Sequence, residues 1–147
     1  VVDDIHRILS GCCSRVNVEP NPVVVKLAHC QHLHTPIEGV LKAGIEDAHL
    51  LSLLHPTPAV GGRPREQAMR WILDREPFER GIYAAPVGWI GAKAAEFCVG
   101  IRSGLVRGVS LTLYAGAGIV PGSDADAEWN EIHAKMAAFL HVMMEGI

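Results

Sequence analysis

YAGAGIVPGSDADAEWNEIHAK, the segment from Tyr114 to Lys135, joins a predicted strand to a predicted helix. Apolar and polar residues alternate over 109–114, which is typical of a strand. The small residues at 115–118 follow, and glycines there allow a ligand to approach the backbone closely. Ser123, followed by the acid Asp126, resembles a capping box with Asp in place of the usual Glu or Gln. The pattern predicts that a helix begins here.

The predicted helix carries an apolar stripe with a charged flank beside it. At about 100° per residue, the stripe consists of Trp129, Ile132, Met136, Leu140 and Met143. The flank consists of Glu128, Glu131 and Lys135. As a solvated helix edge, it would gain a few tenths of a kcal/mol from Glu131–Lys135 and lose a similar amount to Glu128–Glu131 repulsion. Because Mg²⁺ binds carboxylate oxygens, a divalent-cation site is the alternative interpretation.

The composition is that of an ordinary globular domain, with 49% hydrophobic and 20% charged residues among 147. The net charge of −3 gives no support for a nucleic-acid or anionic-membrane partner. No apolar run reaches the ~20 residues of a membrane span.

The cysteines lack C-x-x-C spacing, so free thiols in a reducing compartment are expected. The chain opens within a helical pattern and without methionine, and we expect it to be a piece of a longer protein.

Helices and strands are both predicted along the rest of the chain. Helices are expected up to Gly11 and from Pro64 to Glu76, the second with Ala68, Trp71 and Ile72 inward. The remaining segments are predicted as a turn-rich connection at 16–22, strands over 23–40 broken at Pro36, a short helix or Ω-like excursion at 44–54, a rigid loop at 55–62, and an antiparallel three-strand meander at 81–90, 97–102 and 109–114.

Two further groups of residues suggest binding chemistry. Cys30, His32 and His34 would share one face of a strand, which allows either a zinc site or hydrogen-bonded histidines. Arg102 ends an apolar segment and either reaches solvent or presents a planar fork to a carboxylate or phosphate. The exposed N–H groups of the 115–118 turn suit the same anion. Arginine, glycine amides and helix-start acids together describe a site for a metal-bound carboxylate.

Several motifs resemble those of the chorismate-utilising enzymes, and the isochorismate synthases most closely. They occur in family order across almost the whole chain: QHLHTPIEG (31–39), HPTPAVGG (55–62), EPFERGIYAAPVGW (76–89), VGIRSGLV (99–106) and YAGAGIVPGSDADAEWNEIHAK (114–135). HPTPAVGG favours isochorismate synthases, because anthranilate and aminodeoxychorismate synthases tend to have a glycine-threonine or glycine-serine version of this loop. The resemblance implies an Mg²⁺-dependent isomerase that adds water at C2 of chorismate and expels the C4 hydroxyl. Its product would serve menaquinone, phylloquinone, salicylate or siderophore biosynthesis.

The resemblance also implies roles for individual residues. Glu131 matches the family's C-terminal magnesium ligand, and Glu128 matches an acid that acts near it. Lys135 matches a lysine near the ring carboxylate. The residues that match the clamp on the enolpyruvyl carboxylate and the rest of the substrate pocket are Arg102, Gly116, Gly118, Tyr83, His32, Thr35 and Ala59. The base lysine, the acid glutamate and the first magnesium glutamate would all lie upstream of Val1, so no catalytic residue is assigned.

The fold implied by the resemblance is α+β, with antiparallel sheets and helices outside. Residues 1–147 would form the C-terminal portion of a single chorismate-binding catalytic domain, in a bacterial cytoplasm or a plastid stroma. Chorismate and isochorismate would be its ligands, and the isolated portion would be inactive and poorly soluble. The alternatives are a salicylate, anthranilate or aminodeoxychorismate synthase relative, or a truncated ligand-binding module without catalysis.

Overall fold

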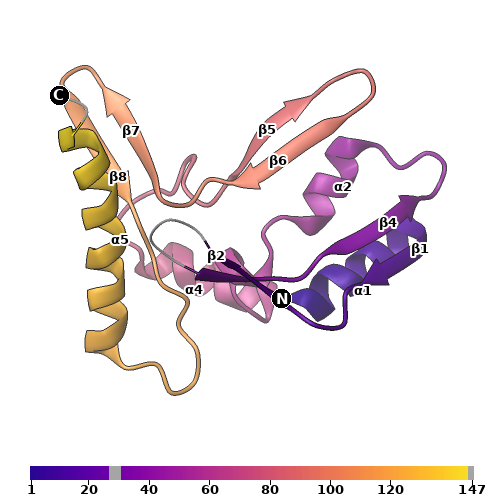
Figure 1. Ribbon diagram of the computed structural model, residues 1–147, viewed down its shortest axis with the longest axis horizontal. Coiled ribbons are helices and arrows are strands. Elements are labelled where there is room, and N and C mark those ends of the chain that lie inside the picture. The colour runs from indigo at the N-terminus through magenta and orange to yellow at the C-terminus, as the bar shows by residue number, and fades with distance from the viewer. Residues whose placement is uncertain (27–30, 146–147) are drawn as a thin grey trace. The chain divides into compact units, whose positions relative to one another are not determined.

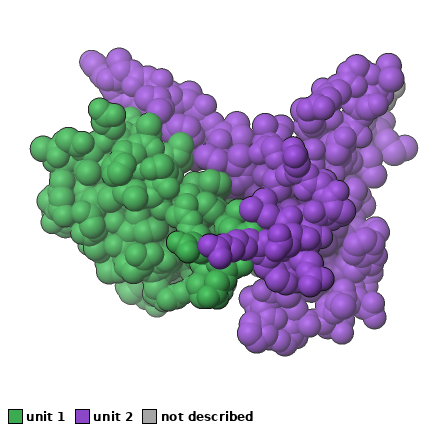
Figure 2. All heavy atoms as spheres, turned by 180° about the vertical axis from the view of Figure 1, so that it is seen from behind, with its two compact units in different colours: residues 1–69 green, residues 70–147 purple. Residues whose placement is uncertain are grey.

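Helices and short antiparallel hairpins alternate along the computed structural model, which describes residues 1–26 and 31–145 (Figure 1). The chain divides into two compact units, residues 1–69 and 70–147 (Figure 2). Each described sheet is a single antiparallel pair of strands. The predicted α+β class, with antiparallel sheets and helices, is therefore confirmed.

The first unit opens with a helix packed on a strand pair. Helix α1 (Val2–Cys12) contacts β1 (Cys13–Val18), which pairs with β4 (Ile37–Leu41). The helix ends close to Gly11, as predicted. The prediction of a turn-rich connection at 16–22 is wrong at its start, because β1 continues to Val18 through its pairing with β4.

A second strand pair lies between β1 and β4 in the sequence. Strand β2 (Val23–Lys26) pairs with β3 (Gln31–His34), and the chain leaves the sheet before β4 begins at Ile37. The predicted strands with a break at Pro36 are thus confirmed within the described residues.

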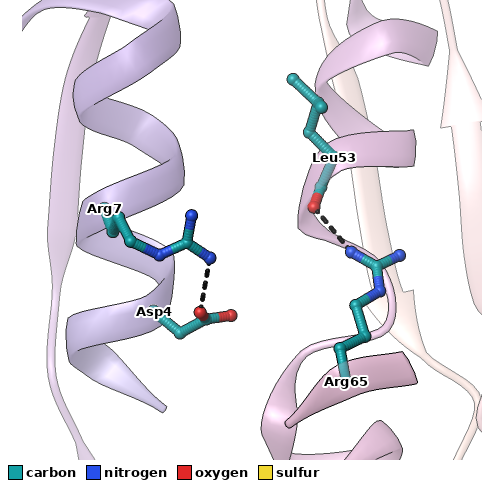
Figure 3. A network of polar contacts seen from close by, with 4 residues as sticks. All are labelled: Asp4, Arg7, Leu53 and Arg65. Atoms are coloured by element: carbon teal, nitrogen blue, oxygen red, sulfur yellow. Dashed lines mark hydrogen bonds and ion pairs between the residues drawn. The ribbon is translucent and has the colours of Figure 1, made fainter. Parts of the chain in front are cut away.

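Short helices follow in the first unit. For residues 44–54, where the sequence allowed a short helix or an Ω-like excursion, the structure has helix α2 (Asp47–Leu54). Helix α3 (Pro58–Gly61) adds one helical turn inside the predicted rigid loop. Arg65 links the start of α4 to the end of α2, because its guanidinium donates hydrogen bonds to the backbone carbonyls of Leu53, at 3.2 Å, and of His55. Figure 3 shows the Arg65–Leu53 contact, and also the Asp4–Arg7 ion pair of 2.7 Å on α1.

Helix α4 (Arg65–Arg75) begins one residue after its predicted start. The Pro64 carbonyl instead accepts a hydrogen bond from the Ala68 N–H at 2.9 Å. The prediction that Trp71 faces inward is wrong, since it is 63% exposed, whereas Ala68 and Ile72 are half-buried. An inward helical position needs an element to cover it, and sequence periodicity does not supply one.

The second unit contains two β-hairpins. Strands β5 (Pro86–Ile90) and β6 (Ala95–Val99) form one hairpin, and β7 (Ser103–Arg107) and β8 (Ser110–Tyr114) form the other. The predicted three-strand meander is therefore wrong. Residues 103–107 fall in a predicted connection, but they form strand β7 by pairing with β8, although Gly104 weakens the strand pattern.

The β7–β8 turn also falls where a strand residue was expected. Gly108 has a φ of 58° at the first central position of a two-residue loop, the place where type II′ hairpin turns require glycine. Val109 is the second loop residue and is fully exposed.

Helix α5 (Ala125–Glu145) begins where the sequence predicts a helix, but its capping residue differs. Asp124 Oδ1 accepts the Ala127 N–H at 2.9 Å, so Asp124 is the N-cap. Ser123 Oγ instead donates to Glu128 Oε1 at 2.7 Å. The predicted capping box with Asp126 is therefore wrong.

The apolar stripe of α5 is largely exposed rather than buried. Trp129 is 61% exposed, Leu140 44% and Met143 39%, while Ile132 and Met136 are half-buried. Among the described residues, the buried hydrophobic side chains are Cys12, Cys13 and Ala84, each still 5–6% exposed. Hydrophobic burial within residues 1–26 and 31–145 is therefore slight for a chain of this size.

The thiol and membrane predictions concern the same described residues. Cys12, Cys13 and Cys98 are free thiols, as predicted, and Cys30 lies outside the described residues. Over the described ranges, no helix combines the length and the apolar character that a membrane crossing requires.

Candidate functional site

The β7–β8 pairing brings Arg102 to the same end of the hairpin as the glycine turn. Ser103 is paired with Tyr114, so the residue before β7 and the residue after β8 lie at one edge. Arg102 has a φ of 49°, in the left-handed region that is uncommon for a residue with a side chain. This local conformation sets the direction in which the exposed arginine leaves the hairpin.

Lys135 connects α5 to the glycine turn. Its Nζ donates to the Gly116 carbonyl at 2.9 Å and lies 2.5 Å from Glu131 Oε1. The lysine side chain is 23% exposed and the glutamate side chain 54%. The structure therefore brings together Gly116, Glu131 and Lys135, three residues that the sequence assigns to one site.

The charges around Glu131 favour its ionised form. The hydrogen bond from Lys135 is the main cause that lowers the pKa of Glu131, followed by the charge of Lys135, and the charge of Arg102 adds to the effect. Arg102 thus acts electrostatically on the same carboxylate that Lys135 holds. Two cationic side chains and an anion form the charged part of the site.

Tyr83 lies against the glycine turn from another direction. A Cβ atom added to Gly116 would collide with the Tyr83 hydroxyl, so this position has room only for glycine while Tyr83 keeps its place. No comparable contact exists at Gly118, where a Cβ would meet nothing within 4 Å. The two glycines therefore differ: Gly116 is packed, and Gly118 is open.

An aromatic cluster supports Tyr83, and sequence analysis did not identify its other members. The rings of Tyr83 and Tyr114 stack with centroids 5.4 Å apart and planes 13° apart. Phe78 lies 6.3 Å from Tyr83 and 5.8 Å from Tyr114, both between ring centroids. Burial raises the pKa of the Tyr83 hydroxyl above its usual value.

A half-buried ion pair between Glu76 and Arg80 lies beside the Tyr83 ring. Arg80 donates to both carboxylate oxygens of Glu76, at 2.7 and 2.6 Å, and its guanidinium lies 5.6 Å from the Tyr83 ring centroid. Bidentate geometry holds the arginine in one orientation over the ring. The pair lies just after α4, in a segment that is not helical, so the four-residue spacing of Glu76 and Arg80 was only a weak signal in the sequence.

Glu128 and Glu131 lie one turn apart on α5. Ser123 Oγ donates to Glu128, and Lys135 pairs with Glu131. Mg²⁺ is commonly held by one or two carboxylates and keeps several waters, so this donor set fits that ion. Among the residues described, no three His, Cys, Asp or Glu side chains form a group able to hold a metal ion. The fit therefore rests on a pair of carboxylates.

The remaining predicted site residues belong to the first unit. His32 lies in β3 opposite Val25, Thr35 follows β3 and is half-buried, and Ala59 is exposed on α3. The zinc hypothesis falls partly on Cys30, which lies outside the described residues. The structure thus places these residues but does not assign them a ligand.

The first unit also has a hollow of about 440 Å³ over β1 and β4. Its lining comprises Arg15, Val16, Asn17, Glu38, Gly39 and Val40. None of the predicted site residues lines it. The residues that the sequence predicts to bind a ligand therefore do not line this hollow.

Comparison with known proteins identifies the class of protein. A family model described as "Chorismate binding enzyme" matches residues 1–144. The chain is 46% identical to isochorismate synthase 2, chloroplastic, of Arabidopsis thaliana, over 95% of this chain and 25% of that protein. It is 42% identical to isochorismate synthase MenF of Bacillus subtilis, over 97% of this chain and 31% of that protein.

A solved structure extends the similarity to the fold. The putative 2,3-dihydroxybenzoate-specific isochorismate synthase DhbC of Bacillus anthracis matches with a TM-score of 0.91 and 35% identity, over 97% of this chain and 38% of that one. The chain therefore belongs to the chorismate-binding enzyme family. It spans between a quarter and two-fifths of the length of these relatives.

Proposed function

We propose that the full-length protein containing this chain is an isochorismate synthase, an isomerase that converts chorismate to isochorismate. A C–O bond forms at C2 with water, the ring double bonds shift, and the C4–O bond breaks as the hydroxyl leaves. Family membership and the names of the relatives support this activity. The structural observation that carries it is the grouping of Gly116, Glu131 and Lys135 near the charge of Arg102.

The proposed roles follow from the charges of the ligand. Chorismate carries two carboxylates, so it needs cationic and N–H partners at both, each contact contributing about 1.5–3 kcal/mol. Arg102 and the glycine turn would bind the enolpyruvyl carboxylate, and Lys135 would serve the ring carboxylate. Tyr83 would line the same end. In the first unit, His32, Thr35 and Ala59 are proposed to line the ring pocket.

Glu131, with Glu128 beside it, would hold Mg²⁺ on α5. When bound, the ion supplies charge neutralisation and orientation for a carboxylate. The general base and general acid are assigned to no residue of this chain and are proposed to come from the remainder of the protein. We further propose that the protein acts in a bacterial cytoplasm or a plastid stroma.

The test is turnover of chorismate by the full-length protein, with isochorismate measured by chromatography. We expect isochorismate to accumulate with Mg²⁺ and to stop accumulating when EDTA removes the ion. Formation of salicylate and pyruvate would show lyase chemistry instead. Chorismate binding without any product would identify a ligand-binding module and contradict the proposal.

A further inference from the structure

Lys135 already has two partners within this chain. Its ammonium group lies 2.5 Å from Glu131 Oε1 and donates to the Gly116 carbonyl at 2.9 Å. An ammonium has three N–H donors, so these contacts leave one for any further acceptor. The lysine proposed to meet a substrate carboxylate is thus also held by groups of the protein itself.

The Glu131 contact conflicts with the binding of a metal ion. A divalent cation on Glu131 would need the same carboxylate that the ammonium now holds. The ammonium of Lys135 and a divalent ion also repel each other at such short range, and the double charge of the ion strengthens this repulsion. The ammonium and the metal therefore compete for Glu131.

The Gly116 contact does not share this conflict. The carbonyl belongs to the turn after β8, and the lysine side chain is mostly covered there, with 23% exposed. A lysine that loses Glu131 consequently remains anchored beside the turn. The N–H that it withdraws from Glu131 becomes available for an anionic group at the same place.

We propose that Lys135 is the built-in counterion of Glu131 in the metal-free protein. It gives up this carboxylate when a divalent cation binds, stays anchored on Gly116, and turns the released N–H toward a ligand carboxylate. Lys135 is then a positioning residue that links metal binding to substrate binding. This inference rests on the assignment of Glu131 to the metal in the proposed function.

Calorimetric titration of the full-length protein with Mg²⁺, in the absence of chorismate, tests the inference without relying on turnover. Lys135→Met removes the competing charge, so the protein should bind Mg²⁺ about threefold to tenfold more tightly. Lys135→Arg keeps the charge and should bind it with nearly unchanged affinity. Lys42→Met is the matched control, because Lys42 also donates to a backbone carbonyl, that of Gly11 at 2.7 Å. It should leave the affinity unchanged.

An equal or weaker Mg²⁺ affinity of Lys135→Met, in a protein whose circular dichroism matches wild type, would overturn the inference. Lys135→Gln provides the same measurement if the methionine variant does not fold. Absence of Mg²⁺ binding in both wild type and variant also overturns it. Chorismate turnover by the wild-type protein, assayed separately, decides the proposed activity, so the two failures are distinguishable.

Discussion

Gly116 is the most tightly constrained position of the candidate site. Its carbonyl accepts a hydrogen bond from Lys135, and the Tyr83 hydroxyl occupies the space where a side chain would begin. The sequence indicated that glycine is needed near a ligand, but not which atom excludes a side chain. That atom comes from a residue 33 positions away along the chain (116 − 83).

Gly116→Ala should impair substrate binding. Overpacking of this kind costs about 1–3 kcal/mol, so KM for chorismate should rise by roughly five- to 150-fold. Gly118→Ala is the matched control and should have little steric effect, since its Cβ would meet nothing within 4 Å. Adding Tyr83→Phe to Gly116→Ala removes the colliding hydroxyl and should restore much of the affinity. Failure of this rescue would contradict the packing explanation.

Arg102→Lys tests the proposed carboxylate fork. A lysine keeps the charge but cannot form two parallel N–H contacts, so KM should rise by about tenfold or more while the protein stays folded. Arg107→Lys, at the opposite end of β7, is the control and should leave KM unchanged. Steady-state kinetics of the full-length protein provide the measurement. Unchanged kinetics for Arg102→Lys would remove this residue from the site.

Glu131→Gln and Glu128→Gln compare the two carboxylates of α5. We expect Glu131→Gln to raise the Mg²⁺ concentration for half-maximal activity by at least about tenfold, because a neutral amide is a poor ligand for a hard cation. Glu128→Gln should have a smaller effect, since Ser123 already donates to this carboxylate. Small and equal effects would instead describe a solvated helix edge.

Among the secondary-structure elements, the start of α5 shows how local side-chain geometry selects one of several similar residues as the cap. Ser123, Asp124 and Asp126 are all plausible near a helix N-terminus, yet Asp124 accepts the Ala127 N–H. The Ser123 hydroxyl instead donates a hydrogen bond to the Glu128 carboxylate. Strand β7 is a similar case, because its pairing with β8 establishes a strand that its own five residues barely indicate.

Asp124→Ala should destabilise the first turn of α5 by about 1 kcal/mol, the usual cost of losing an N-cap. The Ala127 amide donates a hydrogen bond to Asp124, so its hydrogen exchange should accelerate in this variant. Asp124→Asn keeps an acceptor oxygen and should retain most of the protection. Asp126→Ala removes an acid from the same turn and should cost only a few tenths of a kcal/mol. Equal losses for both alanine variants would contradict the assignment of the cap.

For the molecule as a whole, much apolar surface is exposed and few side chains are buried among the described residues. Trp71, Trp129 and Leu73 are each more than 60% exposed, while the buried hydrophobic residues among those described are all small. Each described sheet is one strand pair, which leaves strand edges without a neighbour. Two-stranded hairpins are marginally stable unless other elements cover them.

Residues 1–147, produced alone, should therefore show no cooperative thermal unfolding transition and should aggregate. We also expect no isochorismate formation from this portion. Scanning calorimetry and the chorismate assay, run beside the full-length protein, measure both properties. A cooperative transition with Mg²⁺-dependent turnover would show that residues 1–147 suffice for folding and catalysis.

Motifs and residue patterns were enough to predict the α+β class, the family resemblance, the start of α5 and the assignment of Gly116, Glu131 and Lys135 to one site. These depend on short patterns and motif order, which are local properties of the chain. The three-dimensional structure was needed to show that Asp124 is the cap, that β7 is a strand, and that the Tyr83 hydroxyl closes the space at Gly116. The cap depends on which of several neighbouring side chains reaches the Ala127 N–H, and the strand depends on pairing with β8. The steric contact at Gly116 joins residues that are far apart in the sequence, so no local pattern specifies it. The Lys135–Glu131 pair follows from its i,i+4 spacing on α5, whereas the hydrogen bond from Lys135 to the Gly116 carbonyl is a tertiary contact; together they give the α5 lysine its proposed second role.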